Sequence, residues 1–171
     1  HRLQRRKGKP EPVPGKCPRA TPYINHLIAV ADLVANVGGE SEEDVLVAAV
    51  LHDVVEDTVA TPKDVQDRFG THVRAMVMEV TDDKSFEKSK RKELQVEHAP
   101  HLSPGAKLVK LADKIHNCED LIRNPPEWSS ERIQEYFEWS RRVVDALGSV
   151  NEALEARFNA VYARRHDCLG A

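Results

Sequence analysis

Helix-start signals divide this chain into segments separated by short breaks. Three of these signals pair Ser or Thr with a following proline, at Thr21-Pro22, Thr61-Pro62 and Ser103-Pro104. The hydroxyl of such a residue can cap the first turn, and proline is tolerated at the first helical position because an N–H there would be unpaired. Apolar residues three or four positions apart follow each pair, which predicts amphipathic helices.

Further signals set the bounds of the other helices. The first helix is expected to end at Gly38-Gly39 and to carry an apolar stripe made of Ile24, Leu27, Ile28, Ala31 and Val34. Ser41 and Asp44 resemble a capping box that opens the next helix. Later breaks are predicted at Gly70, 81–83, Pro125-Pro126 and Gly148. Alternating β-branched runs are missing, so we expect an all-α chain of about eight helices without a sheet.

The chain is long enough to bury a core. It has 171 residues, of which 40% are hydrophobic and 5% aromatic, and this fits one domain. We expect that domain at residues 21–166. Residues 1–20 are rich in Lys, Arg and Pro, which predicts a basic arm and a loop, and 167–171 would form a tail.

Composition excludes several classes of protein. A net charge of −3 and a pI near 6.3 give no global electrostatic basis for binding nucleic acid or a membrane surface. No stretch approaches the roughly 20 apolar residues of a membrane span. Cys17, Cys118 and Cys168 are widely spaced, which predicts neither a disulfide framework nor a zinc knuckle. We expect a cytoplasmic protein that acts on a small molecule, and the sequence leaves its oligomeric state open.

One polar run suggests a bound cation. His52-Asp53-Val54-Val55-Glu56-Asp57 follows the apolar stretch 45–51. If the run is helical, His52 lies beside Glu56 and Asp53 beside Asp57. Two carboxylates at that spacing repel each other, and a divalent cation would turn the repulsion into attraction. The alternative is a solvated acidic helix end.

Two more polar residues interrupt apolar helices. His26 is consistent with a hydrogen-bonded core histidine or with a ligand. Asp113 is harder to place in a core, because a buried carboxylate needs a cation, several donors or a raised pKa. With His52 and Asp53, these residues would offer two nitrogen and two oxygen ligands from three helices. Such a set leaves coordination positions open, as catalytic metal sites do.

Several segments resemble a known family. They are Tyr23-Ile24-Asn25-His26, His52-Asp53-x-x-Glu56-Asp57-Thr58, Phe69-Gly70, Val80-Thr81-Asp82-Asp83-Lys84 and Lys107-Leu108-Val109-Lys110-Leu111-Ala112-Asp113-Lys114. In this order they resemble the hydrolase domain of RelA/SpoT proteins, which belong to the HD-domain phosphohydrolases. The narrower resemblance is to the small stand-alone animal members, and it runs from about His1 to about Arg165.

The resemblance implies a fold and a reaction. The fold would be an all-α HD-domain bundle, with manganese held by His26, His52, Asp53 and Asp113 and with a catalytic acid/base pair made of Glu56 and Asp57. The donor set suits manganese and leaves zinc and iron open. The reaction would remove the 3′-pyrophosphate of (p)ppGpp, giving GDP or GTP and pyrophosphate. The resemblance to the animal members also implies removal of the 2′-phosphate of NADPH.

The resemblance further implies substrate contacts at Arg6, Lys7, Asn117, Arg132 and Tyr136. Cations suit phosphates, and an aromatic ring suits stacking. Arg6 and Lys7 are equally consistent with a flexible basic tail, and Arg132 with Tyr136 fits ordinary packing on a helix face. Residues 8–20 form a longer and more proline-rich loop than family members usually have, which affects where Arg6 and Lys7 lie.

Other functions are compatible with parts of the pattern. An HD-type hydrolase with this site would also suit a deoxynucleoside monophosphate or a cyclic dinucleotide. The non-enzyme alternative is a nucleotide sensor or RNA-binding module that works through the basic arm, with salt-sensitive binding. Glu56 and Asp57 argue against it, since a pure binder needs no acid/base pair. The division of acid and base roles between them stays open, because a close carboxylate pair titrates as a unit.

Overall fold

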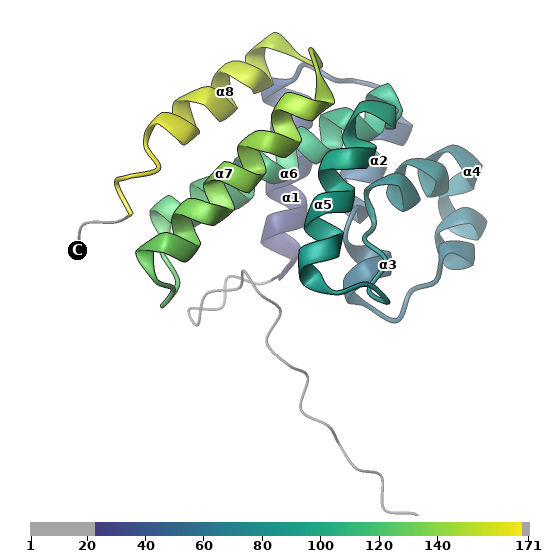
Figure 1. Cartoon of the computed structure of the whole chain (residues 1–171). Helices are drawn as coiled ribbons and strands as arrows, with labels where there is room; N and C mark the ends of the chain where they lie inside the picture. The colour runs from purple at the N-terminus through teal and green to yellow at the C-terminus, as the bar shows by residue number, and fades with distance from the viewer. Residues whose placement is uncertain (1–22, 169–171) are drawn as a thin grey trace, which may run out of the picture.

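Helix α6 (Pro104–Arg123) lies at the centre of the computed structural model, which describes residues 23–168. The helices that contact it are α1 (Tyr23–Asp32), α2 (Glu43–Leu51), α4 (Pro62–Val80), α7 (Ser130–Leu147) and α8 (Glu152–Ala163). Figure 1 shows α7 and α8 on one side of α6 and α4 on the other. Leu111, Ala112 and Ile115 of α6 are fully buried. A helix with apolar residues around most of its circumference is expected inside a fold.

The remaining elements are shorter. They are the π-helical turn Leu33–Val37, the short helix α3 (Val54–Asp57), the charged helix α5 (Lys88–His98) and the 3-10 helix Ala99–His101. The described residues thus form eight α-helices and no strand, which confirms the all-α prediction. No helix among them is long and apolar enough to cross a membrane.

Helix caps form where the hydroxyl and proline pairs predicted them. Thr61 and Asp64 form a capping box: the Thr61 hydroxyl accepts from the Asp64 N–H at 3.2 Å, and the Asp64 carboxylate accepts from the Thr61 N–H at 2.8 Å. Ser103 caps α6 by accepting from the N–H of Ala106. These bonds pair N–H groups that have no partner inside the helix. Thr21-Pro22 lies outside the described residues.

The predicted capping box at Ser41 and Asp44 is wrong. Helix α2 begins one residue later than that box requires, with Glu42 at the cap position and no side-chain cap. The carboxylate of Glu40 accepts instead from the N–H groups of Ser41 and Glu42, at 2.7 and 2.8 Å. This carboxylate bonds the chain just before the helix, and α2 starts without a side-chain cap.

The predicted apolar stripe of α1 is also partly wrong. Ile24 and Ile28 are 48% and 55% exposed, whereas Leu27, Val30 and Val34 are buried. Leu27, Val30 and Val34 repeat at three and four positions, so the buried face keeps the helical period but is centred on Val30 instead of Ile28.

The acidic run does not form one continuous helix, but the expected Asp53 and Asp57 pair keeps its one-turn spacing, since the N–H of Asp57 donates to the carbonyl of Asp53 at 2.8 Å. Helix α2 ends at Leu51, and α3 begins at Val54. Between them Asp53 has φ −101° and ψ −3°, a conformation typical of turns. The break at Gly70 is confirmed, because α4 bends there at φ 91° and ψ 172°.

The domain bounds stay a prediction. The basic arm at 1–20 and the last three residues of the tail lie outside the described residues, as does Cys17. Cys118 and Cys168 are free, in keeping with the expectation of no disulfide framework.

Candidate metal and catalytic site

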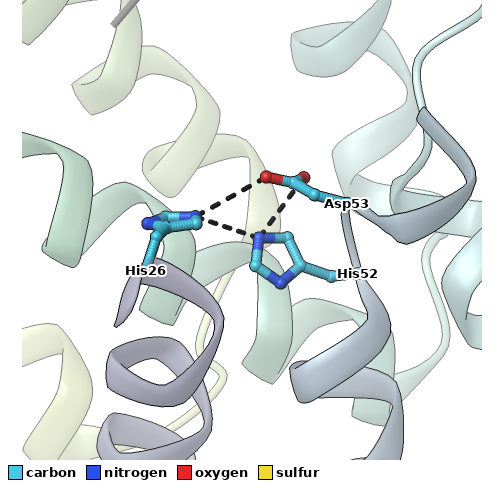
Figure 2. A group of neighbouring side chains, drawn as sticks. All are labelled: His26, His52 and Asp53. Atoms are coloured by element: carbon cyan, nitrogen blue, oxygen red, sulfur yellow. Dashed lines mark hydrogen bonds and ion pairs between the residues drawn. The ribbon is translucent and has the colours of Figure 1, made fainter. Parts of the chain in front are cut away.

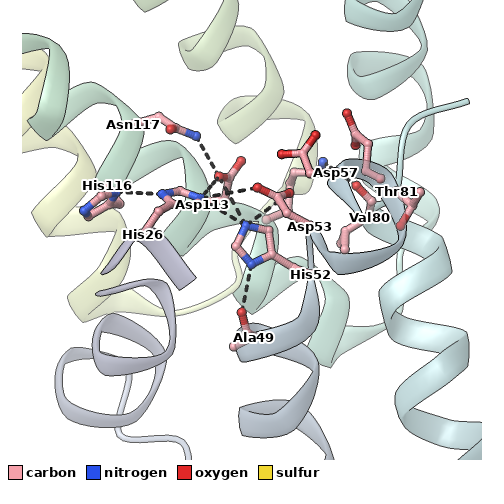
Figure 3. Close-up of polar contacts among 12 residues, drawn as sticks. His26, Ala49, His52, Asp53, Asp57, Val80, Thr81, Asp113, His116 and Asn117 are labelled. Carbon is pink, nitrogen blue, oxygen red and sulfur yellow. Dashed lines mark hydrogen bonds and ion pairs between the residues drawn. The ribbon is translucent and has the colours of Figure 1, made fainter. Parts of the chain in front are cut away.

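Two imidazoles and two carboxylates from three parts of the chain meet between α1, α6 and the α2–α3 junction. Figure 2 shows His26 facing His52 and Asp53, and Figure 3 adds Asp113 of α6. The Nε2 atoms of His26 and His52 are 3.1 Å apart. His26 Nε2 lies 3.7 Å from Asp53 Oδ2 and 3.3 Å from Asp113 Oδ1. His52 Nε2 lies 3.3 Å from Asp53 Oδ1 and 3.7 Å from Asp113 Oδ1.

These separations fit a shared divalent cation. Ligand atoms about 2.1 Å from an ion are about 3.0 Å apart at right angles and about 3.4 Å apart at tetrahedral angles. His26, His52 and Asp53 each offer one ligand atom within 4.8 Å of the others. The side chain of His52 is 3% exposed and that of Asp53 is 28% exposed, so solvent reaches the site from the side of Asp53. Mixed nitrogen and oxygen donors with an open side are typical of catalytic metal sites.

Hydrogen bonds at Nδ1 of His52 and His26 leave the Nε2 atoms of both rings free to bind a cation. His52 Nδ1 lies 2.8 Å from the carbonyl oxygen of Ala49, as Figure 3 shows. A carbonyl only accepts, so Nδ1 carries the proton and Nε2 keeps a lone pair. His26 Nδ1 lies 2.8 Å from Nδ1 of His116, whose pKa is lowered by burial and by the nearby His26. A neutral His116 can accept the His26 proton, and His26 Nε2 then also keeps its lone pair.

The predicted acid/base pair lies on α3, next to the cluster. Glu56 Oε2 accepts from the backbone N–H of Asp82 at 3.1 Å, and Asp57 Oδ1 accepts from Lys84 Nζ at 3.1 Å. Burial raises the pKa of Glu56; the Asp82 N–H lowers it, and the carboxylates of Asp82 and Asp53 raise it further. A carboxylate with a raised pKa is suited to accept a proton during catalysis.

A cavity of about 240 Å³ connects the cluster with two predicted substrate residues. Asn117 and Tyr136 line it, together with the four residues of the cluster and both α3 carboxylates. Asn117 Nδ2 donates to Asp113 Oδ1 at 2.6 Å and so orients a member of the cluster. The Tyr136 ring lies 6.2 and 5.3 Å from the ring centroids of Trp128 and Trp139. These three rings form an aromatic wall of the cavity.

Of the remaining predicted substrate residues, Arg132 is described, and it does not line the cavity. Its guanidinium lies 4.0 Å from the ring centroid of Trp128, a residue of the aromatic wall. Arg6 and Lys7 lie outside the described residues. Their contacts with a substrate, like the ligand and acid/base roles of the clustered residues, stay predictions.

Several residues of the site were not predicted from the sequence. Trp139 follows Tyr136 by three positions on one helix, so the aromatic wall had a readable signal in the spacing. His116 had none, because its contact with His26 spans 90 positions. Lys110 also lines the cavity, donates to the carbonyl of Val80 at 3.2 Å, and has a pKa lowered by burial.

Comparison with known proteins places this site in a family. The HD domain profile matches residues 15–138, a span that contains all four residues of the cluster. This chain belongs to the HD-domain family. The all-helical HD-domain fold expected from the sequence is thereby confirmed.

Within the HD-domain family, the chain is closely related to animal proteins. Human guanosine-3′,5′-bis(diphosphate) 3′-pyrophosphohydrolase MESH1 is 51% identical over 166 residues, which cover 96% of this chain and 88% of the human protein. MESH1 of Drosophila melanogaster is 46% identical, with the same coverage. The bifunctional (p)ppGpp synthase/hydrolase SpoT of Escherichia coli K12 is 32% identical over 85% of this chain and 22% of its own length.

Solved structures agree with these relationships. A structure described as "A metazoan ortholog of SpoT hydrolyzes ppGpp and plays a role in starvation responses" has a TM-score of 0.85 and 47% identity, covering 89% of this chain and 86% of that one. A Listeria monocytogenes protein at 22% identity has a TM-score of 0.70, covers 85% of this chain and 98% of its own, and shares the fold.

Proposed function

We propose that this HD-domain protein is a manganese-dependent hydrolase that removes the 3′-pyrophosphate of (p)ppGpp, giving GDP or GTP and pyrophosphate. We propose NADPH, which would lose its 2′-phosphate, as a second substrate. The observation that carries the proposal is a single cavity lined by His26, His52, Asp53 and Asp113 together with Glu56 and Asp57, in which ligand atoms of the first three residues lie within 4.8 Å of one another. The name of the human relative, 51% identical, supports the first reaction. Both reactions hydrolyse a phosphate ester on a ribose, so one site can serve them.

The cation would be held by His26, His52, Asp53 and Asp113. When bound, it supplies a Lewis acid that neutralises phosphate charge and acidifies water. Manganese suits a site with two imidazoles and two carboxylates. The fixed tautomer of His52 supports this assignment, because the bond from Nδ1 to Ala49 leaves the other nitrogen as a donor to a metal.

Glu56 and Asp57 would handle the protons of the reaction. We assign Glu56 as the base that takes a proton from the attacking water, because burial raises its pKa and makes it a stronger base than an ordinary glutamate. Asp57 lies next to it in the sequence and lines the same cavity. We assign Asp57 as the acid that gives a proton to the departing ribose oxygen when its bond to phosphorus breaks.

Cations near the aromatic wall favour a substrate with several phosphates. Burial and the nearby Arg132 lower the pKa of Lys88, and burial and Lys88 lower that of Lys92. Lys92 Nζ also lies 4.9 Å from the ring centroid of Trp139. Clustered cations that lower one another's pKa gain stability when an anion binds between them. The substrate contacts that we propose are Asn117, Arg132, Tyr136, Arg6 and Lys7.

A panel of nucleotides tests the proposal. The protein loaded with Mn²⁺ is incubated with ppGpp, pppGpp, NADPH, a deoxynucleoside monophosphate and a cyclic dinucleotide; phosphate and pyrophosphate are measured separately, and the nucleotide products are separated by chromatography so that ring opening of the cyclic dinucleotide is also detected. We expect pyrophosphate from the first two substrates, phosphate from NADPH, and neither product from the last two. Pyrophosphate release that persists in Asp53→Ala, or hydrolysis confined to the last two compounds, would overturn the proposal.

A further inference from the structure

The helix that carries both proposed acid/base residues is too short to hold its own shape. Helix α3 consists of four residues, Val54–Asp57, none of them buried. An isolated helical turn is unstable in water, because nucleation fixes several residues for one hydrogen bond. Val59, just after α3, is 99% exposed and adds no apolar anchor. The positions of Glu56 and Asp57 must therefore be set largely by contacts from outside α3.

Val55 packs against the apolar cluster of α2 and α4, and the segment 81–87 between α4 and α5 supplies the polar contacts. Lys84 Nζ donates to the backbone carbonyl of Glu56 at 2.5 Å and to Asp57 Oδ1 at 3.1 Å. It also lies 4.0 Å from Glu56 Oε1. The N–H of Asp82 donates to the other carboxylate oxygen of Glu56 at 3.1 Å. One lysine thus bonds the backbone of one acid/base residue and the side chain of the other.

Helix α5 holds this segment in turn. Gln95 Nε2 donates to both carboxylate oxygens of Asp82, at 2.9 and 2.8 Å. The N–H of the same aspartate donates to Glu56, so a line of contacts runs from α5 through Asp82 to the catalytic carboxylate. A fixed attachment on α5 gives Lys84 a defined position from which to bond α3.

We propose that Lys84 is a positioning residue that fixes Glu56 and Asp57 in their reactive arrangement without touching the substrate. The proposal rests on the function proposed above, since it gives those two carboxylates their roles. It differs from a role in cation binding: among the described residues, the hydrogen bonds and ion pairs of the Lys84 ammonium all go to α3, whereas the proposed cation donors lie on α1, on α6 and at the α2–α3 junction. Loss of Lys84 should therefore affect turnover and leave cation affinity unchanged.

Lys84 also affects how Glu56 titrates. The charged groups that face Glu56 are Asp82 and Lys84 of the segment, Arg91 of α5 at 4.0 Å, and the neighbouring Asp53. Lys84 lowers the pKa of Glu56 against the effect of burial. Without the lysine charge, that pKa rises further, and Glu56 becomes protonated at a higher pH. Activity that needs ionised Glu56 is then lost at a higher pH than in the unchanged protein.

Three variants test the proposal. Lys84→Met removes the contacts, Lys84→Arg keeps the charge and a donor, and Lys90→Met is the control. Lys90 is matched in exposure, at 49% against 50% for Lys84, and its ion pair among the described residues is with Glu93 on its own helix. We expect kcat of Lys84→Met to fall by about ten- to a hundredfold with KM and the Mn²⁺ dissociation constant within about twofold. The acid limb of its pH profile should move up by about 0.5 unit or more, and Lys84→Arg should recover most of the lost rate.

Amide hydrogen exchange provides a readout that needs no activity. The N–H groups of Asp57 and Thr58 bond to Asp53 and Val54 within α3, at 2.8 and 3.1 Å. They should exchange faster in Lys84→Met than in Lys90→Met. If both kcat and exchange in Lys84→Met match the control, the positioning role is wrong. If the unchanged protein hydrolyses none of the nucleotides, the proposed function fails instead, and exchange still decides whether Lys84 holds α3.

Discussion

At the scale of single residues, the carboxylates of Asp53 and Glu56 lie three positions apart in the sequence but have different surroundings. Asp53 lies 3.3 Å from Nε2 of His52 and 3.7 Å from that of His26, so its oxygens belong to the proposed cation site. Glu56 instead accepts an N–H from Asp82 and approaches Lys84 and Arg91. Cation binding and proton transfer are therefore assigned to separate side chains, and mutation can separate them.

We expect Asp53→Asn and Glu56→Gln to fail in different ways. Asp53→Asn removes a charged ligand and should weaken Mn²⁺ binding by at least about a hundredfold, with activity lost in parallel. Glu56→Gln keeps every cation donor and should hold Mn²⁺ within about threefold while kcat falls by about a hundred- to ten-thousandfold. Metal content by elemental analysis and steady-state kinetics on ppGpp check both. Loss of metal from Glu56→Gln would contradict the separation of roles.

At the scale of elements, Gly70 allows both halves of α4 to pack against α2. Val65 before the bend and Val73 and Val77 after it share one apolar cluster with Ala48 of α2. Gly70 has φ 91° and ψ 172°, which side chains other than glycine rarely adopt. An added Cβ would meet nothing within 4 Å, so substitution carries a backbone cost without a clash.

We expect Gly70→Ala to lower the free energy of unfolding by about 1–3 kcal/mol, or roughly 2–4 °C in Tm per kcal/mol. Gly39→Ala is the matched control: Gly39 has φ 68° and also has open space around a Cβ. That φ falls in the left-handed helical region, which costs other residues about 1–2 kcal/mol. Thermal unfolding of the two variants should show the larger loss for Gly70→Ala. Equal losses would mean that the bend at Gly70 stores no particular strain.

The helices and their ends also show which features of the fold can be predicted from the sequence. Caps such as Thr61 with Asp64 depend on residues three positions apart and were predictable from local chemistry. The π-helical turn after α1 and the break at Asp53 were not, because packing against other helices selects them over the regular period. The residues of the cation cluster followed from motifs and a family resemblance. The contact between His26 and His116 could not be predicted in this way, since that pair forms only when α1 and α6 pack together.

At the scale of the whole molecule, a cation at this site would tie together three parts of the chain. The donors come from α1, from the junction of α2 and α3, and from α6, the helix at the centre of the fold. His26, the adjacent pair His52-Asp53, and Asp113 are far apart in sequence, so the unfolded chain does not bring them together as a site. A ligand that binds only the folded state stabilises it by mass action, and the gain grows with ligand concentration.

We therefore expect Mn²⁺ to raise the melting temperature of metal-free protein. At a concentration about a hundred times the dissociation constant, the gain is about 2.7 kcal/mol, which for a chain of this size corresponds to roughly 5–11 °C. Differential scanning calorimetry with increasing Mn²⁺, reversed by a chelator, measures it. Asp53→Asn is the control, because it keeps the surface charges that bind Mn²⁺ weakly and lacks one donor of the cluster. An equal rise in that variant would mean that Mn²⁺ stabilises the protein at another place, and the cation site assigned to α1, α6 and the α2–α3 junction would be wrong.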